Sequence, residues 1–168
     1  IQMASDESGI DVKLFGKVEA GDKVKSSLFG SKDSIYKGGL HQPGSKDFIS
    51  DENLFNYQAK VIKDLAATES CVIVGRCADF VLKDYPNVVS VFIHADEEFC
   101  LEQAMERNSM TVKEMQKYIE KTDKYRGDFY KYYTGHEWTD ARNYHLCLDR
   151  FIHGFLQHLA GYFSSVRH

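Results

Sequence analysis

The 168-residue sequence lacks the marks of membrane, secreted and nucleic-acid-binding proteins. No apolar run approaches the roughly 20 residues that a membrane-spanning helix needs. No secretory leader is visible, because residues 1–11 are polar and acidic. The formal net charge is −4, whereas nonspecific nucleic-acid binders usually present a basic surface. These absences predict a cytoplasmic protein with neither a membrane nor a nucleic-acid partner, and they say nothing of its oligomeric state.

Cysteine- and histidine-based sites are also missing. None of the four cysteines forms a Cys-x-x-Cys pair, which argues against a zinc ribbon or a thioredoxin-like site. Cys71 and Cys147 stand in apolar runs and are predicted to be small buried residues with reduced thiols. The seven histidines show no metal-ligand spacing, and no Gly-x-Ser-x-Gly elbow occurs. His145 is interpreted as a packed residue of a strand.

The composition is that of one compact domain. Hydrophobic residues make up 43% of the chain and charged residues 27%, which favours a folded core over disorder. Residues 1–50 are interrupted by seven glycines and predict a mobile cap with short helices near 1–8 and 22–29. The sequence begins with Ile1 and not with methionine, which suggests that the first residues of the protein are absent from it.

Alternating helices and strands are predicted after residue 50. Wide apolar stripes and end signals predict helices over 51–68, 78–84, 96–107, 111–133 and 151–163. Short runs rich in β-branched residues predict buried parallel strands over 71–75, 88–93 and 144–149. This alternation indicates an α/β fold with right-handed crossovers. Three strands are few for a helix-wrapped sheet, so further elements are expected outside the sequence.

Helix-capping residues support three of these helices. Ser50 or Asp51 can cap the first, and Asp96 precedes another. Thr111 and Glu114 have the spacing of a capping box, in which each side chain bonds the backbone N–H of the other. The starts of these helices are therefore predicted with some precision.

The carboxyl ends of the predicted strands are the first places to look for chemistry, because ligands of open α/β sheets bind there. Arg76 follows Gly75 at the end of the first strand and carries a planar fork suited to a phosphate. Asp79, three residues on, is placed to orient Arg76 or to accept a hydrogen bond from a hydroxyl. The alternative is a surface arginine in a loop, paired with a nearby acid.

A second candidate is the basic helix predicted over 111–133. Lys117, Lys121 and Lys124 fall on one of its faces. A mobile basic helix can close over a polyphosphate and stabilise charge on the transferred group. The alternative is a solvated face with i,i+4 pairs such as Glu120–Lys124. The aromatic run 129–133 can stack a base, but packing against the sheet with hydroxyls in water is the favoured interpretation.

No phosphate-binding loop of the form Gly-x-x-x-x-Gly-Lys-Ser/Thr is present. Two glycine spacings imitate it. Gly16–Gly21 is followed by Asp22, which would repel a phosphate, and Gly39–Gly44 is followed by Ser45 and Lys46 in the reverse order. Neither follows a clear strand or opens a helix, so both are rejected.

Five segments carry a specific combination of residues. They are LFNYQAKVI (54–62), SCVIVGRCAD (70–79), KTDKYR (121–126), YKYYTG (130–135) and NYHLCLD (143–149). Together they resemble the cytidylate-kinase-like family over about residues 1–149. The resemblance implies a three-layer P-loop kinase-like parallel sheet, incomplete at the N-terminus, with a helical cap and lid. It also implies ATP and Mg²⁺ as cofactors, and a phosphate loop upstream of residue 1.

The resemblance divides the candidate residues between an acceptor site and a lid. Arg76 is implied to contact the acceptor phosphate, with Asp79 beside it in the acceptor site. Arg76, Asp123 and Arg126 would serve catalysis. The lid and its base are implied to supply Asp123, Arg126, Lys121, Lys124 and Arg107.

Two regions depart from the family pattern. Cys100 and Gln103 stand where relatives often carry arginines. After Asp149 the family usually continues through a polar loop, whereas Arg150 here runs straight into an apolar segment. The base of the lid and the region near the adenine are therefore expected to differ from those of relatives.

The expected function is ATP-dependent phosphoryl transfer to a small phosphate-bearing acceptor, a nucleotide such as cytidylate. The single domain is expected to comprise an acceptor-side cap (1–50), a core (51–110), a lid-like helix (111–135) and a C-terminal core (136–168). Two alternatives stay open. One is a non-catalytic nucleotide-binding or regulatory module on the same fold, and the other is an interaction domain that uses residues 1–50.

Overall fold

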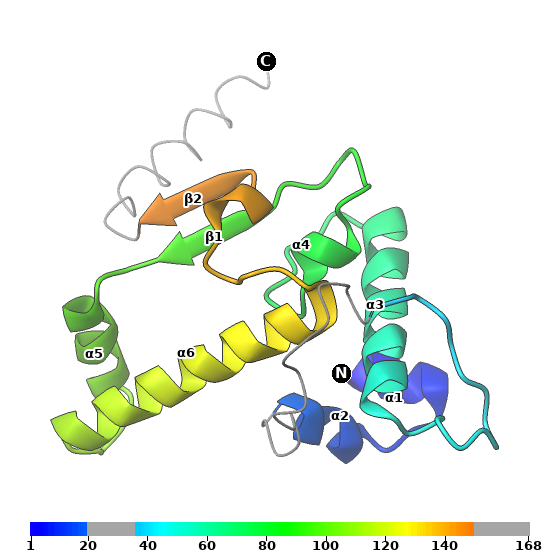
Figure 1. The fold of residues 1–168 in the computed structure, drawn as a ribbon, viewed down its shortest axis with the longest axis horizontal. Helices are drawn as coiled ribbons and strands as arrows, with labels where there is room; N and C mark the ends of the chain where they lie inside the picture. Colours follow the sequence, from blue (N-terminus) through cyan, green and yellow to red (C-terminus); the bar gives the residue numbers. More distant parts are fainter. Residues whose placement is uncertain (20–35, 150–168) are drawn as a thin grey trace. The chain divides into compact units, whose positions relative to one another are not determined.

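The computed structural model describes residues 1–19 and 36–149 (Figure 1). The elements in chain order are α1 (Gln2–Ser8), α2 (Val12–Glu19), α3 (Asp51–Thr68), α4 (Ala78–Val81), β1 (Val91–His94), α5 (Glu97–Met105), α6 (Val112–Thr134), the 3₁₀ turn η1 (Ala141–Asn143) and β2 (Leu146–Asp149). The helices predicted near 22–29 and 151–163, and Arg150, lie outside the described residues. Within residues 1–19 and 36–149, no helix is both long and apolar enough to cross a membrane.

The chain divides into two compact units. The first comprises Ile1–Val88 and Asp123–Asn143, and the second comprises Val89–Thr122 and the segment that starts at Tyr144. The boundary crosses α6, so the two ends of this helix belong to different units.

Helix α3 organises the first unit, because it contributes to two apolar clusters at once. Leu54 and Tyr57 pack with residues of the N-terminal helices in one cluster. Phe55, Ala59 and Ile62 belong to the other, with residues of α4 and of the C-terminal part of α6. Helical periodicity explains the division, since each set recurs at three- or four-residue spacing on its own face.

The segment before α3 is fastened to that helix by an asparagine. Asn53 is fully buried, and its Oδ1 accepts a hydrogen bond from the His41 backbone N–H at 2.8 Å. Its Nδ2 donates to the Phe48 carbonyl at 2.8 Å and to the His41 carbonyl at 3.3 Å. Ser50 Oγ accepts from the Asn53 N–H at 3.2 Å, which confirms Ser50 as the cap.

The second unit contains two parallel strands. β1 pairs with β2 in the register Val91↔Leu146 to His94↔Asp149. Just before the strands, Ser90 Oγ and N lie 3.0 Å from His145 Nδ1. His145 was predicted to be a packed residue of a strand, and this is wrong. It is exposed, and it joins the start of β2 to the start of β1.

The helix predictions are largely confirmed. α3 has the predicted bounds, and α5 and α6 begin within one residue of the predicted positions. Asp96 Oδ1 caps α5 by accepting from the Phe99 N–H at 2.8 Å. The capping box of α6 is present, since Glu114 Oε2 accepts from the Thr111 N–H at 3.0 Å and Thr111 Oγ1 accepts from the Glu114 N–H at 3.4 Å. α4 is shorter than predicted, and α2 was not predicted.

The prediction of a strand over residues 71–75 is wrong. In the described part of the chain these residues are not paired as a strand, and Val72 and Val74 are 92% and 85% exposed. A strand exists only where a neighbour supplies hydrogen-bond partners, and among the described residues the sheet consists of β1 and β2 alone.

The prediction that the strands are buried on both faces of the sheet is also wrong for β1 and β2. Val91, Ile93 and Leu146 are 41%, 65% and 49% exposed. The described residues thus form a mixed helix–strand structure with a small parallel sheet, compatible with an α/β kinase-like fold. Cys71 and Cys147 are exposed and not buried, since both stand in these segments, and none of the four cysteines forms a disulfide.

Candidate functional site

The Gly-Arg turn that ends the 71–75 segment has an unusual backbone. Gly75, Arg76 and Cys77 adopt φ angles of 72°, 58° and 52°, all in the left-handed region. Arg76 and Cys77 are the two non-glycine residues with positive φ in the described parts of the chain. Each such residue costs about 1–2 kcal/mol, so the surroundings must hold the turn in place.

Burial of Cys77 and backbone hydrogen bonds stabilise this turn. Cys77 is 4% exposed and packs in the cluster that contains Ala59 and Ile62. The Gly75 carbonyl accepts from the Ala78 N–H at 3.1 Å, and the Cys77 carbonyl accepts from the Val81 N–H at 2.9 Å. Burial raises the pKa of the Cys77 thiol well above its usual range, so this side chain is an inert anchor and not a nucleophile.

Arg76 is half-buried at the centre of this turn. Burial lowers the pKa of its guanidinium, while the nearby Tyr125 opposes the shift. A half-buried guanidinium binds an anion more strongly than an exposed one, because less water competes for its donors. Tyr125 lies on α6, so this part of α6 is close to Arg76. Asp123 and Arg126 are within one helical turn of Tyr125.

Asp79 has a partner that the sequence did not reveal. Tyr130 Oη donates to Asp79 Oδ2 at 2.6 Å, and Tyr130 itself is 5% exposed. Burial raises the pKa of Asp79, and the Tyr130 hydroxyl opposes this shift. The aromatic run 129–133 packs against α3 and α4 within the first unit, where the sheet was the predicted partner, and Phe55 and Tyr133 are stacked at 3.9 Å between ring centroids.

The predicted lid residues of the first unit pair along their own helix. Arg126 Nη1 lies 2.8 Å from Asp123 Oδ1, and Lys124 Nζ lies 2.8 Å from Asp128 Oδ2. All four side chains are exposed. The i,i+4 partner of Lys124 is Asp128 where Glu120 was suggested. Exposed pairs of this kind contribute little stability and are easily exchanged for a ligand.

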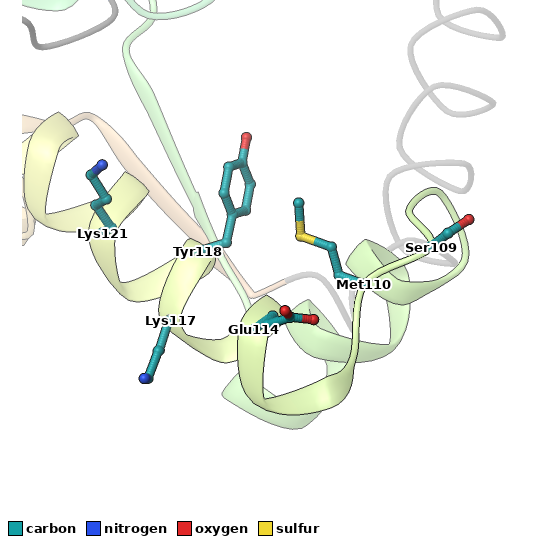
Figure 2. Close-up of a pocket in the computed structure, with 6 residues that line it drawn as sticks. All are labelled: Ser109, Met110, Glu114, Lys117, Tyr118 and Lys121. Carbon is teal, nitrogen blue, oxygen red and sulfur yellow. The ribbon is translucent and has the colours of Figure 1, made fainter.

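Lys121 belongs to the second unit, where it borders an open hollow of about 540 Å³ (Figure 2). The hollow is lined by Ser109, Met110, Glu114, Lys117, Tyr118 and Lys121. In the picture Met110, Tyr118 and Lys121 project to one side, while Lys117 points away from them. Lys117 and Lys121 make no ion pair with any residue of the described parts. Arg107, predicted at the base of the lid, is not among the lining residues.

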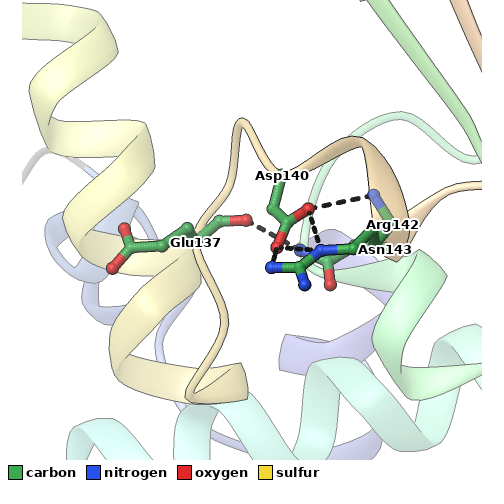
Figure 3. Close-up of polar contacts among 4 residues, drawn as sticks. All are labelled: Glu137, Asp140, Arg142 and Asn143. Atoms are coloured by element: carbon green, nitrogen blue, oxygen red, sulfur yellow. Dashed lines mark hydrogen bonds and ion pairs between the residues drawn. The ribbon is translucent and has the colours of Figure 1, made fainter.

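The loop between α6 and β2 holds a charged cluster that was not predicted (Figure 3). Arg142 Nη2 donates to Asp140 Oδ2 at 2.7 Å and its Nε donates to Asp140 Oδ1 at 2.9 Å. These hydrogen bonds lower the pKa of Asp140 to about 2. Asn143 Nδ2 donates to the Glu137 carbonyl at 2.7 Å, so the cluster orders the loop.

No ready-made cluster of metal ligands for the implied Mg²⁺ is found among the described residues. In 1–19 and 36–149 no three His, Cys, Asp or Glu side chains gather as a ligand set. The Asp79 carboxylate is engaged by Tyr130. The Gly39–Gly44 look-alike lies in an irregular segment with no strand before it and no helix at its end, as expected from its sequence. No residue described here is therefore assigned to the metal.

The parallel strand pair and the Gly-Arg turn are compatible with α/β proteins of the nucleotide kinase kind. A family model described as the cytidylate kinase-like family matches residues 1–151, and the chain belongs to this family. A crystal structure of an uncharacterized protein from Eubacterium ventriosum ATCC 27560 is similar, with 34% identity and a TM-score of 0.57. The match covers 60% of this chain and 64% of that one, so the chain spans less than two thirds of its relative's length. No curated protein matches.

Family membership indicates a nucleotide kinase-like function. It does not name the acceptor, because the similar crystal structure is of an uncharacterized protein.

Proposed function

We propose that the full-length protein is an ATP-dependent phosphotransferase that acts on a small phosphate-bearing acceptor, a nucleoside monophosphate of the cytidylate type. The observation that carries the proposal is the Arg76 turn. Two consecutive left-handed residues are costly, and such strain is typical of sites where a side chain must be held in one position. The residue so held is an arginine, whose fork matches a phosphate.

The proposed mechanism relies on positioning and charge, as phosphoryl transfer generally does. Arg76 binds the acceptor phosphate through two parallel N–H···O bonds. Arg126, oriented by Asp123, stabilises negative charge on the transferred group, and Lys121 and Lys124 assist it. In this proposal Asp79 and Tyr130 form the wall of the acceptor site.

The proposed division of the chain follows from these roles. Residues 1–50 form an acceptor-side cap, 111–135 a lid, and Arg107 lies at the base of the lid. ATP, when bound, supplies the phosphoryl group. Apart from the α6 side chains that act on the transferred group, no residue described here is proposed to bind ATP.

A second candidate is a non-catalytic nucleotide-binding module on the same fold. It is favoured by the ion pairs on α6, where Arg126 and Lys124 already have acidic partners. This candidate predicts nucleotide binding by calorimetry without phosphoryl transfer.

The test uses the full-length protein with ATP, Mg²⁺ and a panel of nucleoside monophosphates. Arg76→Ala should lower kcat/KM for the acceptor by about 100-fold or more, because it removes a preorganised charge contact. Arg76→Lys should recover little, since a point charge cannot replace the fork. Arg142→Ala, which removes an exposed arginine of the same unit, is the matched control and should leave activity unchanged. Absence of turnover and of nucleotide binding would contradict both candidates.

A further inference from the structure

Three buried amide side chains lie in the first turns of α3. Asn53, Asn56 and Gln58 are 0%, 3% and 5% exposed. A buried amide without hydrogen bonds costs about 1–3 kcal/mol, so each of them calls for a partner.

Asn53 and Asn56 have structural partners. Asn53 makes the three bonds that fasten the preceding segment to α3. Asn56 Nδ2 donates to the Gly39 carbonyl at 2.5 Å, which fastens another part of that segment. Although Asn56 Oδ1 is left over, the side chain as a whole has an evident role in the fold.

Gln58 has no such role. Its Oε1 is shielded from solvent and accepts no hydrogen bond from the described residues, and its side-chain nitrogen donates none to them. Methionine at this position would fill a similar volume without the penalty. A buried polar group with no partner in the protein calls for an explanation, and a role in the functional site is one of them.

The position of Gln58 connects it to the Arg76 turn. On the surface of α3 its neighbours at three and four residues are Leu54, Phe55, Val61 and Ile62. Phe55 and Ile62 belong to the cluster that contains Cys77, the residue after Arg76, whereas Leu54 and Val61 belong with the other cluster. Gln58 therefore lies on the seam between the two clusters, at the border of the packing that supports Arg76.

We infer that Gln58 is a specificity residue of the acceptor site, an inference that rests on the proposed function. Its buried Oε1 accepts a hydrogen bond from an N–H or O–H of the neutral part of the acceptor, while Arg76 holds the phosphate. The chemistry fits an amino group on the base edge, because the glutamine amide offers one acceptor and one donor side by side. Acceptors that lack a donor at this place leave the amide unpaired and are rejected.

The experiment compares Gln58→Met with Asn53→Leu in the full-length protein. Initial rates are measured with cytidine, uridine, adenosine and guanosine monophosphates, and the melting temperature of each variant is recorded. Gln58→Met should melt no lower than the wild type, since it removes an unpaired buried amide. It should also lower kcat/KM for the preferred acceptor by about 10-fold to 100-fold and reduce the preference among the four by a similar factor, with KM for ATP unchanged.

Asn53→Leu is the matched control, because it removes a buried amide that is bonded. It should melt lower while keeping the order of preference among the acceptors. If Gln58→Met melts as low as Asn53→Leu or fails to fold, the amide is structural and the inference is overturned. Unchanged acceptor preference with normal turnover would overturn the inference alone. No turnover of any acceptor by the wild type would overturn the proposed function together with it.

Discussion

Replacing Tyr130 with phenylalanine should destabilise the folded protein by about 1.5–3 kcal/mol at neutral pH. The Tyr130 hydroxyl donates to Asp79 Oδ2 at 2.6 Å, and Tyr130 is 5% exposed. A hydrogen bond to an ionised acceptor contributes more than one to a neutral acceptor. The substitution also removes one of the donors of a partly buried carboxylate.

Tyr133→Phe is the matched control, because it removes the same atom from the same aromatic run. The Tyr133 hydroxyl donates to the Asp51 carbonyl at 3.2 Å, which is a longer bond to a neutral acceptor. Its loss should cost about 0.5–1.5 kcal/mol. Both free energies of unfolding are measured by urea denaturation.

The pH dependence gives a second test. Burial raises the pKa of Asp79 above its ordinary value of 3.8, so the folded state binds more protons than the unfolded state just above that pH. The contribution of Asp79 to stability therefore declines as the pH rises through this window. Tyr130→Phe raises the pKa further, because the hydroxyl favours the ionised carboxylate. Its excess cost over Tyr133→Phe should shrink as the pH falls and Asp79 is protonated. An equal cost for both variants at pH 7, or an excess that persists in acid, would refute this reasoning.

Three further predictions concern other parts of the chain. Cys71 should react rapidly with a thiol reagent, whereas Cys77 should react only on unfolding, because it is buried and burial raises its pKa; equal rates would contradict this. The pKa of Asp140 should be about 2 in a carboxyl NMR titration, and Arg142→Ala should return it toward 3.8. Because this pKa is depressed, the associated stability is present above 3.8 and is lost as the pH falls toward 2. Ser50→Ala should cost about 1 kcal/mol by urea denaturation, since it removes the cap of α3, and a neutral effect would assign the cap elsewhere.

The helices could be predicted because their signals are local. The stripe of α3, the Asp96 cap and the Thr111–Glu114 box each lie within a few residues of the element that they define. Strands depend on partners that are distant in sequence. The run 88–93 found its partner in β2, with the parallel direction that was predicted. The run 71–75 has a similar composition but pairs with no strand among the described residues, so its composition alone gave a wrong prediction.

The candidate site shows the same limit. Arg76 could be selected because it follows a glycine at the end of an apolar run and because the segment resembles the family. The left-handed conformation of Cys77 left no mark in the sequence. The bond between Asp79 and Tyr130 joins residues 51 positions apart, and no spacing rule connects them. The roles predicted for the site residues stay predictions; these residues are Arg76, Asp79, Arg107, Lys121, Asp123, Lys124 and Arg126.

The Gly75–Cys77 turn has a consequence for which substitutions the chain can tolerate. At Arg76 the backbone and the proposed chemistry make opposite demands, because glycine would relieve about 1–2 kcal/mol of conformational cost and would also remove the guanidinium. A screen for thermal stability should therefore enrich glycine and asparagine at this position, whereas a screen for activity should retain arginine. A residue on which two such screens disagree is maintained for its function at the expense of the fold. At this turn, substitutions that raise stability would then differ from those that preserve activity.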